Sequence, residues 1–288
     1  MLPIKVALQY IYPKHLISRL VGKLAAAELG PITTAFIRLF IRHFDVDMSE
    51  AQEADPKAYK SFNAFFTRLL KDDARAITQE VNELACPVDG TVSQSGDIDE
   101  GRIFQAKGHD YSLETLLGND KALAESFQDG DFATIYLSPK DYHRIHMPLD
   151  GVLTDMIYVP GELFSVNPLT TAHVPGLFAR NERVVTVFET PKGKMALVLV
   201  GATIVASIET IWAGTVTPPT GKQVHHWTYP NEGPEQITLK KGEEMGLFKL
   251  GSTVVAVFEK DMIELDDSMD AGEITRLGQV MGRLKERD

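Results

Sequence analysis

Residues 184–200, VVTVFETPKGKMALVLV, decide the fold. Two runs of β-forming residues, Val184–Glu189 and Met195–Val200, flank the turn-forming triplet Pro191-Lys192-Gly193. The stretch therefore predicts a β-hairpin. Similar runs, separated by turns rich in Gly, Pro and Asp, occur at Thr134–Leu137, Val152–Val159, Thr203–Ile211 and Thr253–Phe258. A mostly antiparallel β body is the expectation for this part of the chain.

The N-terminal region predicts two amphipathic helices on either side of Gly30-Pro31. In the first, the apolar residues recur with helical spacing and lie opposite Arg19 and Lys23. They are Leu16, Ile17, Leu20, Val21 and Leu24. The second covers Ile32–Phe44 and would extend only about 20 Å, which is too short to cross a bilayer. These helices either pack on the body or lie in a membrane surface, and their basic polar faces favour the membrane.

The charge of the chain is unevenly distributed. Residues 1–44 carry six basic residues and one acidic residue, a formal charge of +5, whereas the whole chain carries −11. The acidic remainder argues against nucleic acid as the main partner, and the basic arm is typical of proteins that rest on anionic membranes. Cys86 is the only cysteine, which excludes a disulfide framework and favours the reducing interior of the cell. The N-terminus does not resemble a signal peptide.

The rest of the chain completes an α+β prediction. Residues 45–80 are expected to be helical and linking, with Phe62, Phe65 and Phe66 in a core or a helix-docking surface. A short helix is expected after Tyr111, capped by Ser112. The acidic end, 261–288, suggests a final strand followed by an exposed helix or tail. We expect a helical, membrane-associating arm at 1–80 and a catalytic, β-rich body with a few short helices at 81–288.

Three short stretches could carry chemistry. Asp89 lies in a tight turn, His143 and His146 are three residues apart, and Gly251-Ser252 enters a strand. Each also has a structural explanation, as a turn former, a surface pair and an ordinary turn. A hydrolase elbow of the Gly-x-Ser-x-Gly type does not surround Ser252. Two alternatives stay open on these residues, a metal-dependent hydrolase that uses Asp89, His143 and His146, and a non-enzymatic, membrane-tethered carrier module.

Taken together, these stretches resemble the short, bacterial type of phosphatidylserine decarboxylase over essentially the whole chain. The matching stretches are 62–66 (FNAFF), 87–90 (PVDG), 105–109 (QAKGH), 136–139 (YLSP), 141–148 (DYHRIHMP), 158–161 (YVPG), 163–167 (LFSVN), 181–183 (NER), 200–203 (VGAT) and 248–253 (FKLGST). Their number and order make coincidence implausible.

The resemblance implies a proenzyme that cleaves itself between Gly251 and Ser252, which gives a β subunit of residues 1–251 and an α subunit of residues 252–288. It assigns Asp89, His146 and Ser252 to a self-processing triad. In that triad His146 takes the proton of the Ser252 hydroxyl, Asp89 holds the imidazole, and the Ser252 oxygen attacks the carbonyl of Gly251.

The resemblance further implies that Ser252 becomes a covalent pyruvoyl group, so that neither an external cofactor nor a metal is needed. This group forms a Schiff base with phosphatidylserine and accepts electrons as CO₂ leaves, and phosphatidylethanolamine is released. His143 is the expected proton donor. The implied partners are phosphatidylserine in anionic membranes and the two cleavage products as a heterodimer, with further homo-oligomerisation open. The implied location is peripheral, on the cytoplasmic face of the cell membrane.

Overall fold

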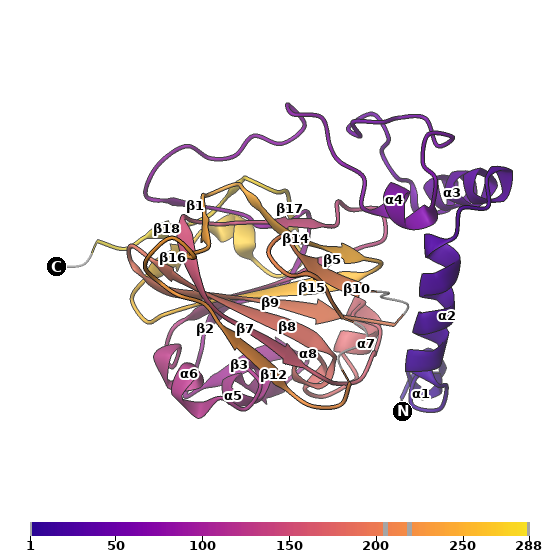
Figure 1. Cartoon of the computed structure of the whole chain (residues 1–288). Helices are drawn as coiled ribbons and strands as arrows, with labels where there is room; N and C mark the ends of the chain where they lie inside the picture. The colour runs from indigo at the N-terminus through magenta and orange to yellow at the C-terminus, as the bar shows by residue number, and fades with distance from the viewer. Residues whose placement is uncertain (1, 204–206, 218–220, 287–288) are drawn as a thin grey trace.

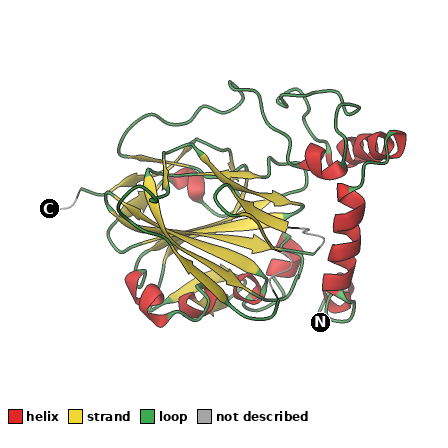
Figure 2. Cartoon of the chain, viewed as in Figure 1, coloured by secondary structure: helices red, strands yellow, loops and turns green. Residues whose placement is uncertain are grey.

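A helical arm stands beside a body of β-sheets in the computed structural model, which describes residues 2–203, 207–217 and 221–286 (Figure 1). Figure 2 shows that the strands form the centre of the body and that short helices lie on its periphery. The α+β class predicted from the sequence is confirmed.

The centre of the body is a nine-stranded sheet whose paired strands are all antiparallel. Its order is β12 (His225–Thr228), β7 (Gly151–Val159), β8 (Arg183–Thr190), β9 (Gly193–Gly201), β15 (Ser252–Phe258), β5 (Asp131–Leu137), β2 (Gly90–Asp97) and β17 (Ile274–Thr275), with β13 (Thr238–Leu239) also paired to β7. The predicted hairpin is β8–β9, which closes at the Thr190–Gly193 pair. The hairpin is therefore confirmed.

The central strands are buried on both faces. In β15, Val254, Ala256 and Phe258 belong to one hydrophobic core, while Val255 and Val257 belong to a second core on the opposite face. Successive side chains of a strand point to opposite faces, so a strand between two cores must be apolar at every position. This explains why β8, β9 and β15 are uninterrupted hydrophobic runs although the sheet is antiparallel.

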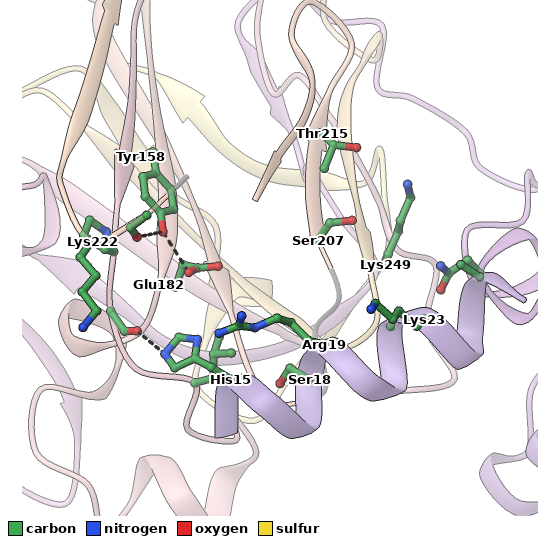
Figure 3. A pocket seen from close by; sticks show the side chains of 17 residues that line it. His15, Ser18, Arg19, Lys23, Tyr158, Glu182, Ser207, Thr215, Lys222 and Lys249 are labelled. Atoms are coloured by element: carbon green, nitrogen blue, oxygen red, sulfur yellow. Dashed lines mark hydrogen bonds between the residues drawn. The ribbon is translucent and has the colours of Figure 1, made fainter. Parts of the chain in front are cut away.

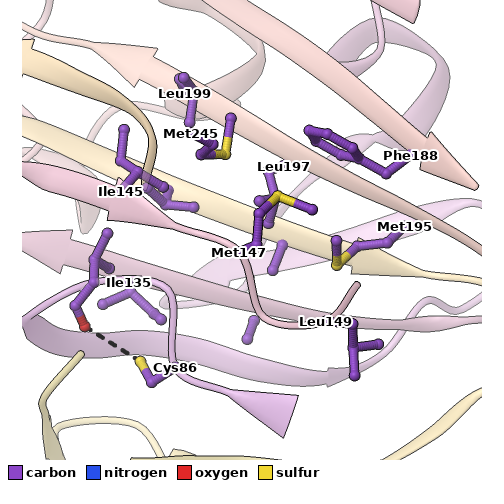
Figure 4. Packing of buried hydrophobic residues seen from close by; sticks show 14 of the residues in the cluster. Cys86, Ile135, Ile145, Met147, Leu149, Phe188, Met195, Leu197, Leu199 and Met245 are labelled. Atoms are coloured by element: carbon purple, nitrogen blue, oxygen red, sulfur yellow. Dashed lines mark hydrogen bonds between the residues drawn. The ribbon is translucent and has the colours of Figure 1, made fainter. Parts of the chain in front are cut away.

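The first core lies between the nine-stranded sheet and two smaller sheets. Figure 4 shows part of it, including Leu197 and Leu199 of β9 with Ile145 and Met245 from the smaller sheets. The four-stranded sheet has the order β11 (Gly214–Thr217), β10 (Ser207–Thr210), β14 (Glu244–Lys249) and β6 (Arg144–His146). The three-stranded sheet has the order β1 (Glu83–Ala85), β18 (Val280–Leu284) and β16 (Ile263–Leu265).

Short helices and one hairpin cover the second core. The hairpin is β3 (Arg102–Ala106) with β4 (His109–Ser112), and the helices are α5 (Leu113–Leu116), α6 (Lys121–Ser126), α7 (Pro168–Thr171) and α8 (Leu177–Arg180). The Ser112 hydroxyl accepts a hydrogen bond from the Thr115 N–H at 3.2 Å, which satisfies an otherwise unpaired donor of α5. The predicted helix after Tyr111 and its cap are confirmed.

The arm contains α1 (Ile4–Leu8), α2 (Lys14–Ala26) and α3 (Pro31–Phe44), and the break at Gly30 is where the sequence predicts it. The polarity of α2 is the reverse of that of a helix packed on a soluble core. Ser18 on the inner side is only 4% exposed, whereas Leu16, Leu20 and Leu24 are 54%, 55% and 67% exposed. An apolar stripe of this kind faces away from the body.

The helix α3 is held by an aromatic cluster. Ile37 is fully buried and packs with Phe62, Phe65 and Phe66, three residues of α4 (Phe62–Phe66). The prediction that these phenylalanines form a core or a docking surface is confirmed. On the other side of α3, Ile32, Phe36 and Leu39 are exposed. In the part of the chain that the structure describes, no single helix has the length and apolarity to span a membrane, whereas α2 and α3 pass that test only as a pair bent by 114°.

Three predictions differ from the structure. Residues 45–80 were expected to be helical, but their only helix among the described residues is α4, because Asp47 and Asp55 bind nearby backbone N–H groups in turns that compete with a helix. The helix or tail expected after the strand near residue 261 is wrong, since a short 3₁₀ helix, Asp267–Met269, is followed by β17 and β18. For the expected strand Thr203–Ile211, β10 covers Ser207–Thr210, and residues 204–206 lie outside the described residues.

Candidate active site

Ser252 is the first residue of β15 and is fully buried. It pairs with Gly201 of β9 on one side and with Leu137 of β5 on the other. The chain after Leu137 makes a tight turn, in which the Asp141 carboxylate accepts a hydrogen bond from the Ser138 N–H at 2.6 Å. This turn directs the chain back towards Ser252, so that His143 reaches it from β5.

His143 lies within hydrogen-bonding distance of Ser252. Its Nδ1 is 3.5 Å from the Ser252 Oγ, and its Nε2 is 3.1 Å from the Ser138 carbonyl oxygen. Because a carbonyl oxygen can only accept, Nε2 must carry the proton, and Nδ1 is left to accept the hydrogen bond of the Ser252 hydroxyl. The serine and the histidine are therefore arranged as a nucleophile and a base.

The surroundings of His143 keep its ring neutral and fixed. The ring stacks on Phe66 with centroids 4.1 Å apart. Burial lowers the pKa of His143 to about 3, and the charge of the buried Arg68 acts in the same direction, against the hydrogen bond to the Ser138 carbonyl. A neutral imidazole can accept a proton, which a base requires.

His146 occupies a neighbouring but separate environment. Its Nδ1 donates to the Gly242 carbonyl oxygen at 2.8 Å, and its Nε2 lies 3.4 Å from the Tyr142 hydroxyl. Burial lowers the pKa of His146. Among the described contacts, none joins His146 to Ser252 in this conformation.

Asp89 is bound by a guanidinium. Arg75 donates from its Nε to Asp89 Oδ1 at 2.9 Å and from its Nη2 to Asp89 Oδ2, a two-pronged pair. The Leu277 N–H also donates to Asp89 Oδ1, at 2.8 Å. Within the described structure, Asp89 makes no hydrogen bond to His146, although its charge is close enough to oppose the lowering of the His146 pKa. The structure thus brings Ser252 and His143 together, and it holds Asp89 and His146 by other groups.

The backbone before Ser252 is strained. Leu250 has φ +91° and Gly251 has φ +38°, both in the left-handed region. Glycine adopts such angles readily, but a leucine there costs about 1–3 kcal/mol. Leu250 is nevertheless buried in the aromatic cluster of α3 and α4. Packing of the arm therefore helps to hold the strained bond that precedes Ser252.

Several polar groups near this pair lack partners in the described part of the chain. They are Nε and Nη1 of Arg68, Oγ of Ser138 and Oγ1 of Thr253. Arg68 is only 4% exposed, and its one hydrogen bond goes from Nη2 to the Lys140 carbonyl. Buried donors without partners are costly, and they are common where a substrate later supplies the partner.

The sequence reasoning missed Arg68, Arg75 and Leu250. A buried arginine in a charged, irregular segment has no sequence signal, because such residues are usually solvated. The strain at Leu250 is also invisible in the sequence, since leucine rarely adopts positive φ. Phe66 was expected in a core, and its stacking on His143 adds a role to that position.

The described residues contain no group of three or more His, Cys, Asp or Glu side chains that could hold a metal ion together. Asp89, His143 and His146, the ligands required by the metal-dependent hydrolase alternative, point to three different sets of partners. That alternative finds no support in their geometry.

A buried serine that opens a central strand, follows a strained turn and contacts a neutral histidine defines a chain suited to attack on its own backbone. The profile of the family described as phosphatidylserine decarboxylase matches residues 62–283, and a second profile, described as PSD, matches residues 4–45. The chain belongs to the phosphatidylserine decarboxylase family.

Curated relatives agree with this assignment over nearly their full length. A protein of Pseudoalteromonas atlantica is 68% identical over 281 residues, 98% of each chain. One of Shewanella frigidimarina is 65% identical over 285 residues, 99% of each chain, and one of Idiomarina loihiensis is 64% identical over 285 residues, 99% of this chain and 98% of its own. All three are named phosphatidylserine decarboxylase proenzyme.

We predict that His143 makes the folded chain less stable as the pH falls. An unfolded histidine binds a proton below about pH 6.5, whereas folded His143 stays neutral down to about pH 3, so the unfolded state binds more protons between these values. The contribution is complete above the upper value and is lost as the pH decreases. In an uncut Ser252→Ala chain, adding His143→Gln should make the fall in Tm between about pH 7 and about pH 5 shallower. Equal slopes in thermal unfolding would contradict the assignment.

Proposed function

We propose that this protein converts phosphatidylserine to phosphatidylethanolamine and CO₂ through a pyruvoyl group that it makes from Ser252. The observation that carries the proposal is the contact between Ser252 Oγ and His143 Nδ1 at the start of β15. It occurs in a chain 68% identical to a curated phosphatidylserine decarboxylase proenzyme. The metal-dependent hydrolase and the carrier module lack comparable support.

The proposed self-cleavage uses groups of the chain alone. The Ser252 oxygen bonds to the Gly251 carbonyl carbon, the peptide C–N bond breaks, and the hydroxyl proton passes through the base to the Ser252 nitrogen. The positive φ values of Leu250 and Gly251 favour this attack, because breaking the bond relieves their strain. Elimination then frees Gly251 as a carboxylate. Hydrolysis of the remaining enamine releases ammonia and leaves a pyruvoyl group at the new N-terminus.

We assign the base by resemblance to His146, held by Asp89, and we keep His143 for the decarboxylation step. The His143–Ser252 contact supports that second role, because His143 would lie beside the carbonyl made from Ser252. In the described conformation His146 donates to Gly242, so the triad requires its ring to turn away from that carbonyl. The contact of His143 with Ser252 makes this assignment directly testable.

The surroundings of Ser252 suit a pyruvoyl group. Such a group supplies a carbonyl that accepts electrons as CO₂ leaves the substrate. The neutral His143 ring and the unpartnered Arg68 N–H groups lie on the side chains next to it. An anionic substrate would raise the pKa of His143, opposing both burial and the charge of Arg68, and would allow the ring to carry the proton that the product needs.

We propose that the two products, residues 1–251 and 252–288, remain together as a heterodimer. The cut falls at the edge of β15, outside its paired residues, and all seven residues of β15 pair with β5 and with β9. The shorter product also contributes β16, β17 and β18, which pair with strands of both sheets.

We further propose that residues 1–80 bind the cytoplasmic face of the cell membrane peripherally, with residues 81–288 as the catalytic body. The exposed leucines of α2 and the exposed side of α3 support this proposal. The substrate is a two-chain lipid that leaves the bilayer reluctantly, so the site must come to the surface. Basic residues in the arm favour anionic lipid.

The mass spectrum of the purified protein tests self-cleavage. The wild-type chain should give two fragments divided after Gly251, with the smaller one lacking an N-terminal amine, whereas Ser252→Ala should stay a single chain. His146→Ala and Asp89→Asn should stay uncut as well, because the base is lost. His143→Ala should be cut but should not release CO₂ from phosphatidylserine.

The reverse pattern would be decisive. If His143→Ala stays whole while His146→Ala is cut, the base is the histidine that contacts Ser252 in this structure. If wild-type protein stays whole and still decarboxylates the lipid, the pyruvoyl proposal is wrong.

Co-sedimentation with vesicles tests the membrane arm. Replacing Leu16, Leu20 and Leu24 with Ser should strongly reduce binding to phosphatidylserine vesicles, because the exposed apolar stripe is lost. Thermal stability should change by no more than about 0.5 kcal/mol per site, as for other exposed positions. Wild-type binding should weaken with added salt and with less anionic lipid. The matched control, Ile274→Ser on the exposed edge of the body, should bind normally, and normal binding by the triple variant would refute the arm's role.

A further inference from the structure

A cavity of about 1010 Å³ lies between α2 and the strands of the body (Figure 3). The inner, polar side of α2 forms one wall, with Arg19 and Lys23 facing the strands. Lys222 and Glu182 lie on the opposite side, and Ser207 and Lys249 lie towards the end of the body nearest α4. The helix that exposes its leucines to the outside therefore directs its cations into a cavity.

The lining is strongly basic. Besides Arg19 and Lys23, it contains Lys222 and Lys249, and among the described lining residues the one acid is Glu182. Lys249 is paired with Glu209, and the Glu182 carboxylate accepts a hydrogen bond from Tyr158. In the part of the chain that the structure describes, Arg19, Lys23 and Lys222 form no salt bridge. Three cations around one cavity favour an anionic ligand.

The cavity borders the reacting segment. Lys249 is the last residue of β14 and precedes Ser252 by three positions, and its strand partner Ser207 lines the same wall. Asn63 of α4 also lines the cavity, and its Oδ1 is buried without a hydrogen-bond partner. Phe66, on the same short helix, stacks on His143. A ligand in the cavity would therefore lie beside the residues that surround Ser252.

We propose that this cavity receives the phosphodiester of the lipid headgroup, and that Arg19, Lys23 and Lys222 contact the phosphate. This inference rests on the proposed function and extends it: α2 is a wall of the substrate site as well as a membrane contact. With its leucines in the membrane surface, α2 presents its cations at headgroup depth, next to the segment that carries Ser252. Substrate and product share the phosphodiester, so both should bind there.

Kinetics with a water-soluble substrate separate substrate binding from membrane binding. With short-chain phosphatidylserine kept monomeric, Arg19→Gln/Lys23→Gln should raise KM by about tenfold, leave kcat within about twofold and leave self-cleavage complete. The matched control, Arg38→Gln/Arg42→Gln, removes the same charge from exposed positions of α3 outside the cavity and should keep the wild-type KM. An unchanged KM in the first variant, or an equal rise in both, would overturn the proposal.

Binding to uncut Ser252→Ala protein provides a readout that does not depend on activity. Glycerophosphoserine and glycerophosphoethanolamine should each raise its Tm, and free serine, which has a carboxylate but no phosphate, should not. Lys222→Gln should weaken both shifts, and because this residue is exposed in the body it also serves if the α2 variant does not fold. Stabilisation by serine alone would assign the cations to the carboxylate and overturn the inference. Failure of wild-type protein to decarboxylate phosphatidylserine would instead overturn the proposed function, whatever these ligands do.

Discussion

The pairing of β15 on both sides is the constraint on which the rest of the structure depends. Its seven residues lie between β9 and β5, and their side chains enter two separate cores. This fixes Ser252 at the end of the sheet, opposite Leu137, from which the chain leads to His143. The nucleophile is therefore positioned by the most deeply buried strand of the body, and the turn before it carries the strain. A rigid support for a reacting group is what catalysis in general requires.

The reversed polarity of α2 connects the membrane and the site. A helix with exposed leucines and an inward polar side would be unfavourable on an ordinary soluble protein, because apolar surface stays in water. Both faces have a use if the leucines enter a lipid surface and the cations line the headgroup cavity. The aromatic cluster adds a second link, since it holds Leu250 together with α3 and α4. The arm thus contacts the body at the places where substrate arrives and where the chain is cut.

Elements with a strong local signal could be predicted from the sequence. The β8–β9 hairpin has a turn triplet between two β-branched runs, α2 and α3 have helical periodicity on either side of Gly30, and α5 has its serine cap. Segments without periodicity were predicted poorly. Residues 45–80 form mostly turns, and the strands after residue 270 are two to five residues long and depend on partners near residues 83–91. Pairing of that kind is a tertiary effect that local sequence does not encode.

The site was predictable only through the resemblance. Ser252 and His143 are 109 residues apart, and no spacing rule brings them together. Nor does the sequence reveal that Arg75 holds Asp89 or that Gly242 holds His146, because each contact depends on the packing of distant segments. The orientation of α2 was also hidden, since periodicity shows that a helix has two faces and does not show which one the body covers.

Hydrogen–deuterium exchange of the cut protein tests the central claim most directly. If β15 remains paired on both sides after the backbone breaks before Ser252, the amides of residues 253–258 should exchange as slowly as those of β9, at the rate of global unfolding. Rapid exchange of these amides in cut, active protein would contradict the account, because the strand that positions the reacting group would then have left the sheet.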